Sequence, residues 1–431
     1  MGGGGLPVDT NHMTGTPIQR TGVVRTLTNS SVVVLERIAQ IGVTLVATLV
    51  IARIFGPQKY GIWQAAQSIF AVTSALCLIV PGEILLPRLK ATHDWERLSV
   101  TLSSALVARI GFGVLILAGY GVGLLVAPVA LRGTLLVALI LQCSIAVTEP
   151  VNGLSSWYQA QLNNVPVSLR RLVGLALRLA IFVLCIVVLG GPALPLLAAA
   201  WPIEALVAGA LVTSMFLASH GAFRFRWTAV ELLSLVRAGL PVWWGLLFYA
   251  LFLKTDRLLL PYRMDPQGFG VYGAAAQLVE TAVGMVILVT NTLMPRLIYH
   301  REGGRLDRKT AAGLLGAIVI ACGATSLMAP VIVRVLFGVG FAGAAPILAI
   351  GIWLAVLAAI DTLLTGILIR ERVFRVVLIK WTVASVLQVV VITILYPRWN
   401  LGGVMAGYLS GYIFVVALSL RALKILRDRV Y

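Results

Sequence analysis

The stretch Gly56–Ala66, GPQKYGIWQAA, decides the fold because a close copy, DPQGFGVYGAA, follows at Asp265–Ala275, 209 residues later. The shared positions are Pro57, Gln58, Gly61, Ala65 and Ala66 in the first copy and Pro266, Gln267, Gly270, Ala274 and Ala275 in the second. At nearly the same offset, LPRL at 86–89 returns as MPRL at 294–297. Convergent turn chemistry is the alternative, but two coincidences at one offset favour an internal repeat.

The composition around this repeat is that of a membrane protein. Hydrophobic residues make up 59% of the 431 residues and charged residues only 12%, and the mean hydropathy is +0.97. These values lie far from those of soluble globular domains. Because a bilayer core needs about 20 apolar residues per helix, the chain can cross the membrane about twelve times. No stretch remains that is long enough for a soluble domain.

The apolar runs fall into two groups of six. The first group is predicted at about 31–55, 61–82, 99–124, 129–149, 171–190 and 194–217, and the second at about 240–263, 270–293, 311–336, 342–368, 373–396 and 401–423. An even number of spans per repeat makes the two halves parallel. The predicted parts are a disordered cytoplasmic tail (1–25), an N-terminal lobe (26–218), a cytoplasmic linker (219–238), a C-terminal lobe (239–426) and a cytoplasmic tail (427–431).

Positive charge is concentrated in every second loop. The formal net charge is +18, and arginines and lysines crowd loops such as 88–97, 224–237 and 370–375, whereas the alternate loops hold few. Because positively charged loops stay in the cytoplasm, both termini are predicted to be cytoplasmic. The charges are scattered between apolar runs rather than gathered in one basic domain, which excludes a nucleic-acid-binding protein.

Charged residues inside the apolar runs of the first half are candidates for substrate binding, because charge at membrane depth is costly and usually faces a cavity or a partner. Arg37, Arg109 and Arg178 lie in the first, third and fifth spans. In the first span, Gln40 and Thr44 follow Arg37 at helical spacing, so the three share one face. Interhelical hydrogen bonding is the alternative for this polar stripe.

The second half carries acidic residues as well. Asp256 and Arg257 lie in the seventh span, Glu280 in the eighth and Asp361 in the tenth. Arg257 joins the substrate-binding candidates. Asp256, Glu280 and Asp361 are candidates for coupling transport to ions or protons, and a structural ion pair is the alternative for each carboxylate.

Several classes of function are excluded by missing motifs. The sequence has no GxxxxGK[ST], no HExxH and no nucleophile elbow, which argues against an ATP-driven pump and a membrane glycosyltransferase. Four cysteines lie far apart in apolar runs, without metal-site or redox spacing. We therefore predict a protein that is not an enzyme and has neither a cofactor nor a metal site.

Three stretches carry a family resemblance: ARIFGPQKYGIW from Ala52, WYQAQLNN from Trp157, and LFGVGFAGAAPIL from Leu336. With the segment between Arg237 and Glu280, they resemble polysaccharide flippases of O-antigen type, in the superfamily of lipid II flippases and multidrug extruders. The resemblance covers the chain from about Thr26 to Leu426. It implies two six-helix lobes around a central cavity. Lipid II flippases typically have two further helices, for which this chain has no room.

The resemblance implies export of an undecaprenyl diphosphate-linked oligosaccharide across the bacterial inner membrane by alternating access, for surface polysaccharide biosynthesis. Its expected partners are this lipid-linked substrate, membrane lipid, a polysaccharide polymerase and glycosyltransferases. Arginines suit the diphosphate because the guanidinium fork binds phosphate oxygens in pairs. The alternative is a cation-coupled exporter of small amphipathic compounds, which an arginine-rich cavity disfavours.

Overall fold

The protein is a bundle of long helices, and the described residues contain no β-strand. The computed structural model describes residues 17–91, 94–161, 163–189, 193–219, 223–294, 308–371 and 373–430. The first half comprises α1 (Pro17–Cys77), α2 (Gly82–Ala91), α3 (Trp95–Val126), α4 (Val129–Ala160), α5 (Val165–Leu189), α6 (Leu194–Ala198) and α7 (Ala200–Ser219). The second half comprises α8 (Ala229–Leu259), η1 (Leu260–Tyr262), α9 (Pro266–Met294), α10 (Arg308–Phe337), η3 (Val339–Phe341), α11 (Ala344–Gly351), α12 (Leu354–Arg370), α13 (Phe374–Trp399) and α14 (Leu401–Val430).

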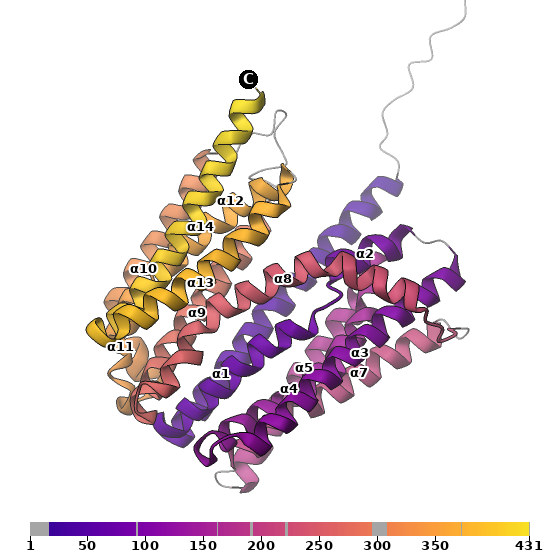
Figure 1. Cartoon of the computed structure of the whole chain (residues 1–431). Helices are drawn as coiled ribbons and strands as arrows, with labels where there is room; N and C mark the ends of the chain where they lie inside the picture. Colours follow the sequence, from indigo (N-terminus) through magenta and orange to yellow (C-terminus); the bar gives the residue numbers. More distant parts are fainter. Residues whose placement is uncertain are drawn as a thin grey trace, which may run out of the picture.

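Helix α1 contains two spans, because its backbone breaks at Gly56. This glycine has φ 70° and ψ 179° within an otherwise helical segment, a conformation that glycine adopts without the steric cost of a Cβ. Arg37 and Phe70, on opposite sides of the break, line the same cavity, whereas a straight helix would hold them about 50 Å apart. The chain therefore turns back at Gly56, and Figure 1 shows the two arms of α1 as separate rods.

The number of spans agrees with the prediction from the sequence. Within the described ranges, 11 helices are long and apolar enough to cross a bilayer, and the first of these covers Glu36–Ala91 with the break inside it. Counting the two arms separately gives twelve spans. The predicted all-α membrane fold of two six-helix lobes is thus confirmed.

Helices extend into the ranges predicted for the tails and the linker. Residues 1–16 of the expected N-terminal tail lie outside the described residues, and α1 already begins at Pro17. Helix α14 continues to Val430, through most of the expected C-terminal tail. Helix α8 begins at Ala229, within the expected linker, because the Thr228 hydroxyl accepts a hydrogen bond from the Glu231 amide at 3.3 Å. This capping arrangement stabilises the first turn of a helix.

Helix α8 belongs to both lobes. Near its start, Glu231 accepts hydrogen bonds from Arg88 of α2 and Thr101 of α3, each at 3.2 Å. Further along, the carbonyl of Phe248 accepts a hydrogen bond of 2.6 Å from Ser385 of α13. The helix therefore ties the first lobe to the second, and Figure 1 shows it crossing between them.

The two copies of the repeated motif meet where α1 turns. A Cβ on Gly270, at the start of α9, would lie 1.8 Å from the carbonyl oxygen of Pro57, and a Cβ on Gly61 would lie 2.8 Å from that of Pro266. Both distances are far below any van der Waals contact, so only glycine fits at these positions. Since each glycine approaches the proline of the other copy, the two halves pack about an approximate two-fold axis.

Further contacts join the lobes at the same end. The guanidinium of Arg53, on the first arm of α1, donates a hydrogen bond of 2.9 Å to the carbonyl of Leu336 and another to the carbonyl of Val335, in the last turn of α10. Tyr60 packs edge-on against Phe341, with ring centroids 5.6 Å apart. The lobes are thus held together at this end, which we call the joined end, and they spread apart toward the end that carries the C-terminus (Figure 1).

Candidate functional site

The first lobe contains a cavity of about 350 Å³ between α1, α4, α5 and α7. Four of the predicted substrate-binding residues line it: Arg37, Gln40, Thr44 and Arg178. Two further arginines, Arg170 and Arg171 of α5, complete its charged wall, and the lining also includes Glu204 of α7. We call this space the cationic cavity.

Two of the four arginines are balanced by carboxylates. Arg178 donates to Glu204 at 2.5 Å and stacks over the ring of Trp201, whose centroid lies 4.5 Å from the guanidinium carbon. Arg171 donates to Glu36 at 2.7 Å. These pairs hold the walls of the cavity in place, because each buried charge finds its partner on another helix.

The other two arginines face the cavity without an ion pair. Arg37 donates to Gln40 at 2.8 Å and Arg170 donates to Asn152 at 3.0 Å. No carboxylate among the described residues lies within ion-pairing distance of either guanidinium. The cavity therefore has an excess of positive charge, which favours an anionic ligand.

Arg109 lies outside the cationic cavity, in contrast to its predicted place beside Arg37 and Arg178. Its side chain is buried, with 2% of its surface exposed, and it donates to the carbonyls of Glu149 at 2.9 Å and Val80 at 2.6 Å. Val80 follows the end of α1, where backbone carbonyls have no partner within a helix. Arg109 thus joins α3 to α4 and to the turn between α1 and α2.

The structure adds two polar residues that were not singled out as site candidates. Arg170 is 5% exposed, and its Nε has no hydrogen-bond partner among the described residues. The Glu149 side chain is buried behind the cavity, where it accepts a hydrogen bond of 2.9 Å from Asn152. Arg170 directly precedes the predicted span 171–190, and Glu149 lies beside Pro150 at the end of the predicted span 129–149, so position along the chain gave no signal for either.

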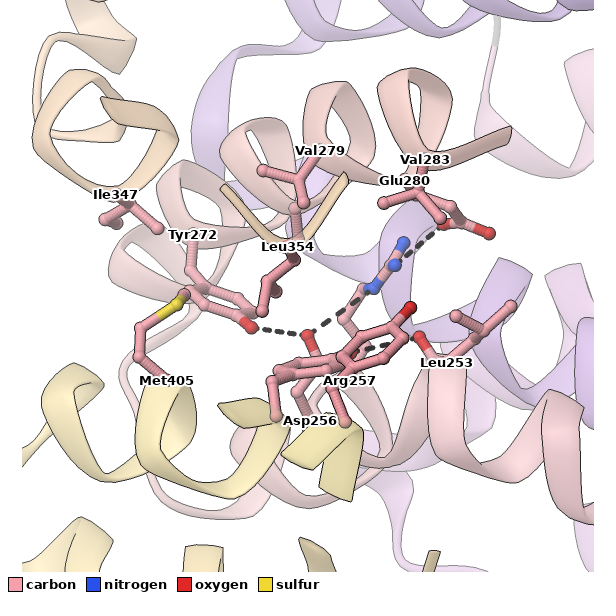
Figure 2. A pocket seen from close by; sticks show the side chains of 13 residues that line it. Leu253, Asp256, Arg257, Tyr272, Val279, Glu280, Val283, Ile347, Leu354 and Met405 are labelled. Atoms are coloured by element: carbon pink, nitrogen blue, oxygen red, sulfur yellow. Dashed lines mark hydrogen bonds and ion pairs between the residues drawn. The ribbon is translucent and has the colours of Figure 1, made fainter. Parts of the chain in front are cut away.

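The second lobe contains a cluster of buried ionisable residues around Asp256 (Figure 2). Asp256 is 1% exposed and accepts hydrogen bonds from the hydroxyls of Tyr272 and Tyr408, the latter at 2.9 Å. Arg257 lies 3.8 Å away. The cluster borders a small cavity of about 40 Å³, room for about one or two water molecules.

Glu280 is held by two cations in the same cluster. Lys254 donates to both of its carboxylate oxygens and Arg257 to one of them, all at 2.7 Å. Arg257 also approaches Gln64 of α1 at 3.4 Å, so the cluster touches the first lobe. Two acids and two bases balance each other here. Arg257, a predicted substrate-binding residue, is therefore placed in an ion-pair network rather than in the cationic cavity.

Asp361 lies at a second cavity of the second lobe, of about 510 Å³. Lys380 of α13 donates to it at 2.5 Å and also contacts the Thr365 hydroxyl at 2.5 Å. All three carboxylates predicted for ion coupling thus have cationic partners.

Within the described ranges, no three His, Cys, Asp or Glu side chains lie close enough to hold a metal ion, and the four cysteines are free thiols.

Two helical lobes built from helices long and apolar enough to cross a bilayer define a multi-pass membrane protein. The chain belongs to the polysaccharide biosynthesis protein family, whose model matches residues 26–299. Among curated proteins, no sequence matches it.

Solved structures with the same fold include a lipid II flippase and multidrug resistance transporters. The lipid II flippase MurJ, in an inward closed conformation, has a TM-score of 0.70 and 13% identity over 92% of this chain and 87% of that chain. An inward-facing multidrug resistance MATE family transporter has a TM-score of 0.71 and 14% identity over 90% of this chain and 95% of the other. An outward-facing one scores 0.54, with 15% identity over 94% and 95%. The arrangement of the lobes is therefore closer to the inward-facing structure.

Proposed function

We propose that this protein is a flippase that moves an undecaprenyl diphosphate-linked oligosaccharide from the cytoplasmic to the outer leaflet of the bacterial inner membrane by alternating access. The observation that carries this proposal is the cationic cavity, where Arg37 and Arg170 have no ion-pair partner among the described residues. Membership of the polysaccharide biosynthesis protein family supports it.

The chemistry of the cavity suits a lipid diphosphate. Guanidinium groups bind phosphate oxygens in pairs and keep their charge when partly buried, whereas a lysine loses its proton more readily. Polar side chains beside them, including Gln40, Thr44 and Asn152, offer hydrogen bonds to the first sugar. The positive charge of the cavity offsets the free-energy cost of removing the diphosphate from water.

The rival function is export of cationic amphipathic compounds, which the likeness to MATE transporters supports. Such compounds would meet an excess of positive charge at Arg37 and Arg170, which repels them. We therefore place this function second. Coupling to an ion or proton gradient through Asp256, Glu280 or Asp361, and contacts with a polysaccharide polymerase or glycosyltransferases, belong to the same proposal.

A deletion strain tests the proposed function directly. Loss of the protein should cause lipid-linked oligosaccharide to accumulate in the cytoplasmic leaflet, and the wild-type gene should reverse this. A gene encoding Arg37→Ala with Arg170→Ala should not reverse it, although the variant reaches the membrane in normal amounts. Normal export in the deletion strain, together with loss of resistance to cationic compounds, would instead support the rival function.

We also propose that both termini are cytoplasmic, so that the joined end faces outward. A membrane-impermeant maleimide added to whole cells should then label a cysteine at Gln267, the second residue of α9, and should miss one at Arg226, which precedes α8. The reason is the concentration of positive charge in loops on the Arg226 side. The reverse labelling pattern would contradict this orientation.

A further inference from the structure

The cationic cavity of about 350 Å³ and the second-lobe cavity of about 510 Å³ are related by the internal repeat. The cationic cavity is lined by both arms of α1 and by α4, α5 and α7, which are the first, second, fourth, fifth and sixth spans of the first lobe. The 510 Å³ cavity is lined by α8, α9, α12, α13 and α14, which are the same five spans of the second lobe. Neither α3 nor α10, the third span of each lobe, contributes to the lining.

Equivalent positions within these cavities carry opposite chemistry. The offset of 209 residues between the motif copies relates Arg37 to Leu246 and Gln40 to Tyr249. All four residues line the cavity of their own lobe. The polar face of the first span is thus replaced by an aliphatic and aromatic face in the seventh.

The rest of the second cavity follows the same pattern. Its walls include Ile287, Leu378 and Trp381 beside a few polar side chains such as Asn291 and Thr362, and none of the arginines that the structure describes lines it. Asp361, the one carboxylate among its described lining residues, is neutralised by Lys380 at 2.5 Å. A cavity whose charge is balanced internally and whose walls are mostly apolar favours an uncharged, apolar ligand. We call it the apolar cavity.

We infer that the apolar cavity binds the isoprenoid hydrocarbon next to the diphosphate of the substrate, while the cationic cavity binds the diphosphate itself. This inference rests on the proposed function, which supplies a ligand with one anionic and one apolar part. Each lobe then recognises one part, and a lipid diphosphate engages both lobes together.

The test compares ligands that share a diphosphate and differ in hydrocarbon. Binding of inorganic pyrophosphate and of geranyl diphosphate is measured by calorimetry on the purified full chain. The wild type should bind geranyl diphosphate at least about tenfold more tightly than pyrophosphate, because the hydrocarbon leaves water. Leu246→Arg, which places a charge in the apolar cavity, should abolish this difference and leave pyrophosphate binding intact.

Two further variants separate the effect of the added charge from effects of side-chain size and of substitution elsewhere. Leu246→Trp keeps the cavity apolar but narrows it, so it should reduce the geranyl preference without adding charge. Leu327→Trp is the matched control, because Leu327 of α10 is 86% exposed and lines neither cavity. This control should bind both ligands as the wild type does.

The outcomes separate this inference from the proposed function. An unchanged geranyl preference in both Leu246 variants would overturn the inference. It would also be overturned if these variants lost binding of a soluble sugar diphosphate, UDP-N-acetylglucosamine, and kept binding of geranyl diphosphate. Failure of the proposed function would give a different binding result. Pyrophosphate binding would then be insensitive to Arg37→Ala with Arg170→Ala, whatever happens to the hydrocarbon.

Discussion

Arg37 and Arg109 carry the same charge within apolar spans but have opposite surroundings. Arg37 faces the cationic cavity and is bonded to Gln40, whereas Arg109 is buried and bonded to two backbone carbonyls. Arg37→Ala should therefore lower export and leave membrane abundance and thermal stability unchanged, with Arg37→Lys in between. Arg109→Ala should lower the unfolding free energy by about 2–5 kcal/mol, because it leaves buried carbonyls unbonded and opens a hole.

Export and abundance are measured together for both variants. A stable Arg109→Ala protein with poor export would return Arg109 to the substrate site. An unstable Arg37→Ala protein would show instead that Arg37 has a structural role. Arg178→Ala offers a further comparison, because it leaves Glu204 without its ion-pair partner and should lower membrane abundance. The double variant with Glu204→Ala should restore that abundance.

Glu280 and Asp256 differ in how firmly their charge is needed. Glu280→Gln removes the carboxylate that holds both Lys254 and Arg257, so two buried cations lose a partner, and we expect destabilisation of about 3–5 kcal/mol. Asp256→Asn keeps one oxygen that accepts from one tyrosine hydroxyl, and its amide group can donate to the oxygen of the other. It should fold normally, and its export should no longer depend on a proton or ion gradient.

Export is measured with and without a protonophore or ionophore, beside thermal stability in detergent. If Asp256→Asn and Glu280→Gln both retain wild-type export and gradient dependence, coupling does not run through this cluster. If only stability falls, the cluster is a structural ion-pair network.

The sequence identified charged residues in the spans but could not sort them by role. Arg37, Arg109 and Arg178 look alike along the chain, because each is an arginine in an apolar run. Their roles depend on which residues of other helices face them, and that is decided by tertiary packing. Arg170 shows the converse case, since it lies just outside the predicted span 171–190 although packing buries it.

At the scale of elements, the reciprocal contact of Gly61 and Gly270 makes the joined end sensitive to a single methyl group. In Gly270→Ala the new Cβ would lie 1.8 Å from the Pro57 carbonyl oxygen, a backbone atom that cannot move without shifting α1. We expect the joined end to open more often, raising the labelling of a cysteine placed at Gln58, and export to fall. Gly284→Ala in the same helix is the matched control, because its Cβ meets nothing within 4 Å.

Labelling rates and export are compared for the two alanine variants. Equal behaviour of Gly270→Ala and Gly284→Ala would mean that the lobes tolerate separation at the joined end without consequence. Gly61→Ala should act in the same direction as Gly270→Ala but more weakly, since its contact is 2.8 Å rather than 1.8 Å.

The helices themselves were largely predictable, because a continuous run of apolar residues long enough to cross a bilayer can form little other than a membrane-spanning helix. The repeated motif located both turns that open the second span of each half. Helix α8 begins at Ala229, within the predicted linker, where Thr228 and Glu231 form a recognisable capping sequence. That signal was masked by the arginines around it, which favoured a loop.

At the scale of the whole molecule, the structure contains one arrangement of the lobes, in which they are held together at the joined end and spread apart at the other (Figure 1). Alternating access requires a second arrangement in which the contacts of Arg53, Tyr60 and Gly270 are broken. Those contacts join helices of one lobe to helices of the other, so the lobes can separate as rigid bodies without unfolding. No pattern in the sequence gives the relative positions of the lobes, because both arrangements use the same helices.

A reversible crosslink at the joined end tests whether export needs this separation. A Cβ on Gly340 of η3, in the second lobe, would lie 3.8 Å from the ring of Pro57 in the first. Cysteines at these two positions, in a background without the four native cysteines, should be joined by a short reagent that contains a disulfide. Export should stop when the link forms and resume when dithiothreitol cleaves it, because the lobes are locked only while the link is intact. Each single-cysteine variant should transport normally after the same treatment, and undiminished export by the fully crosslinked protein would show that substrate passes without opening of the joined end.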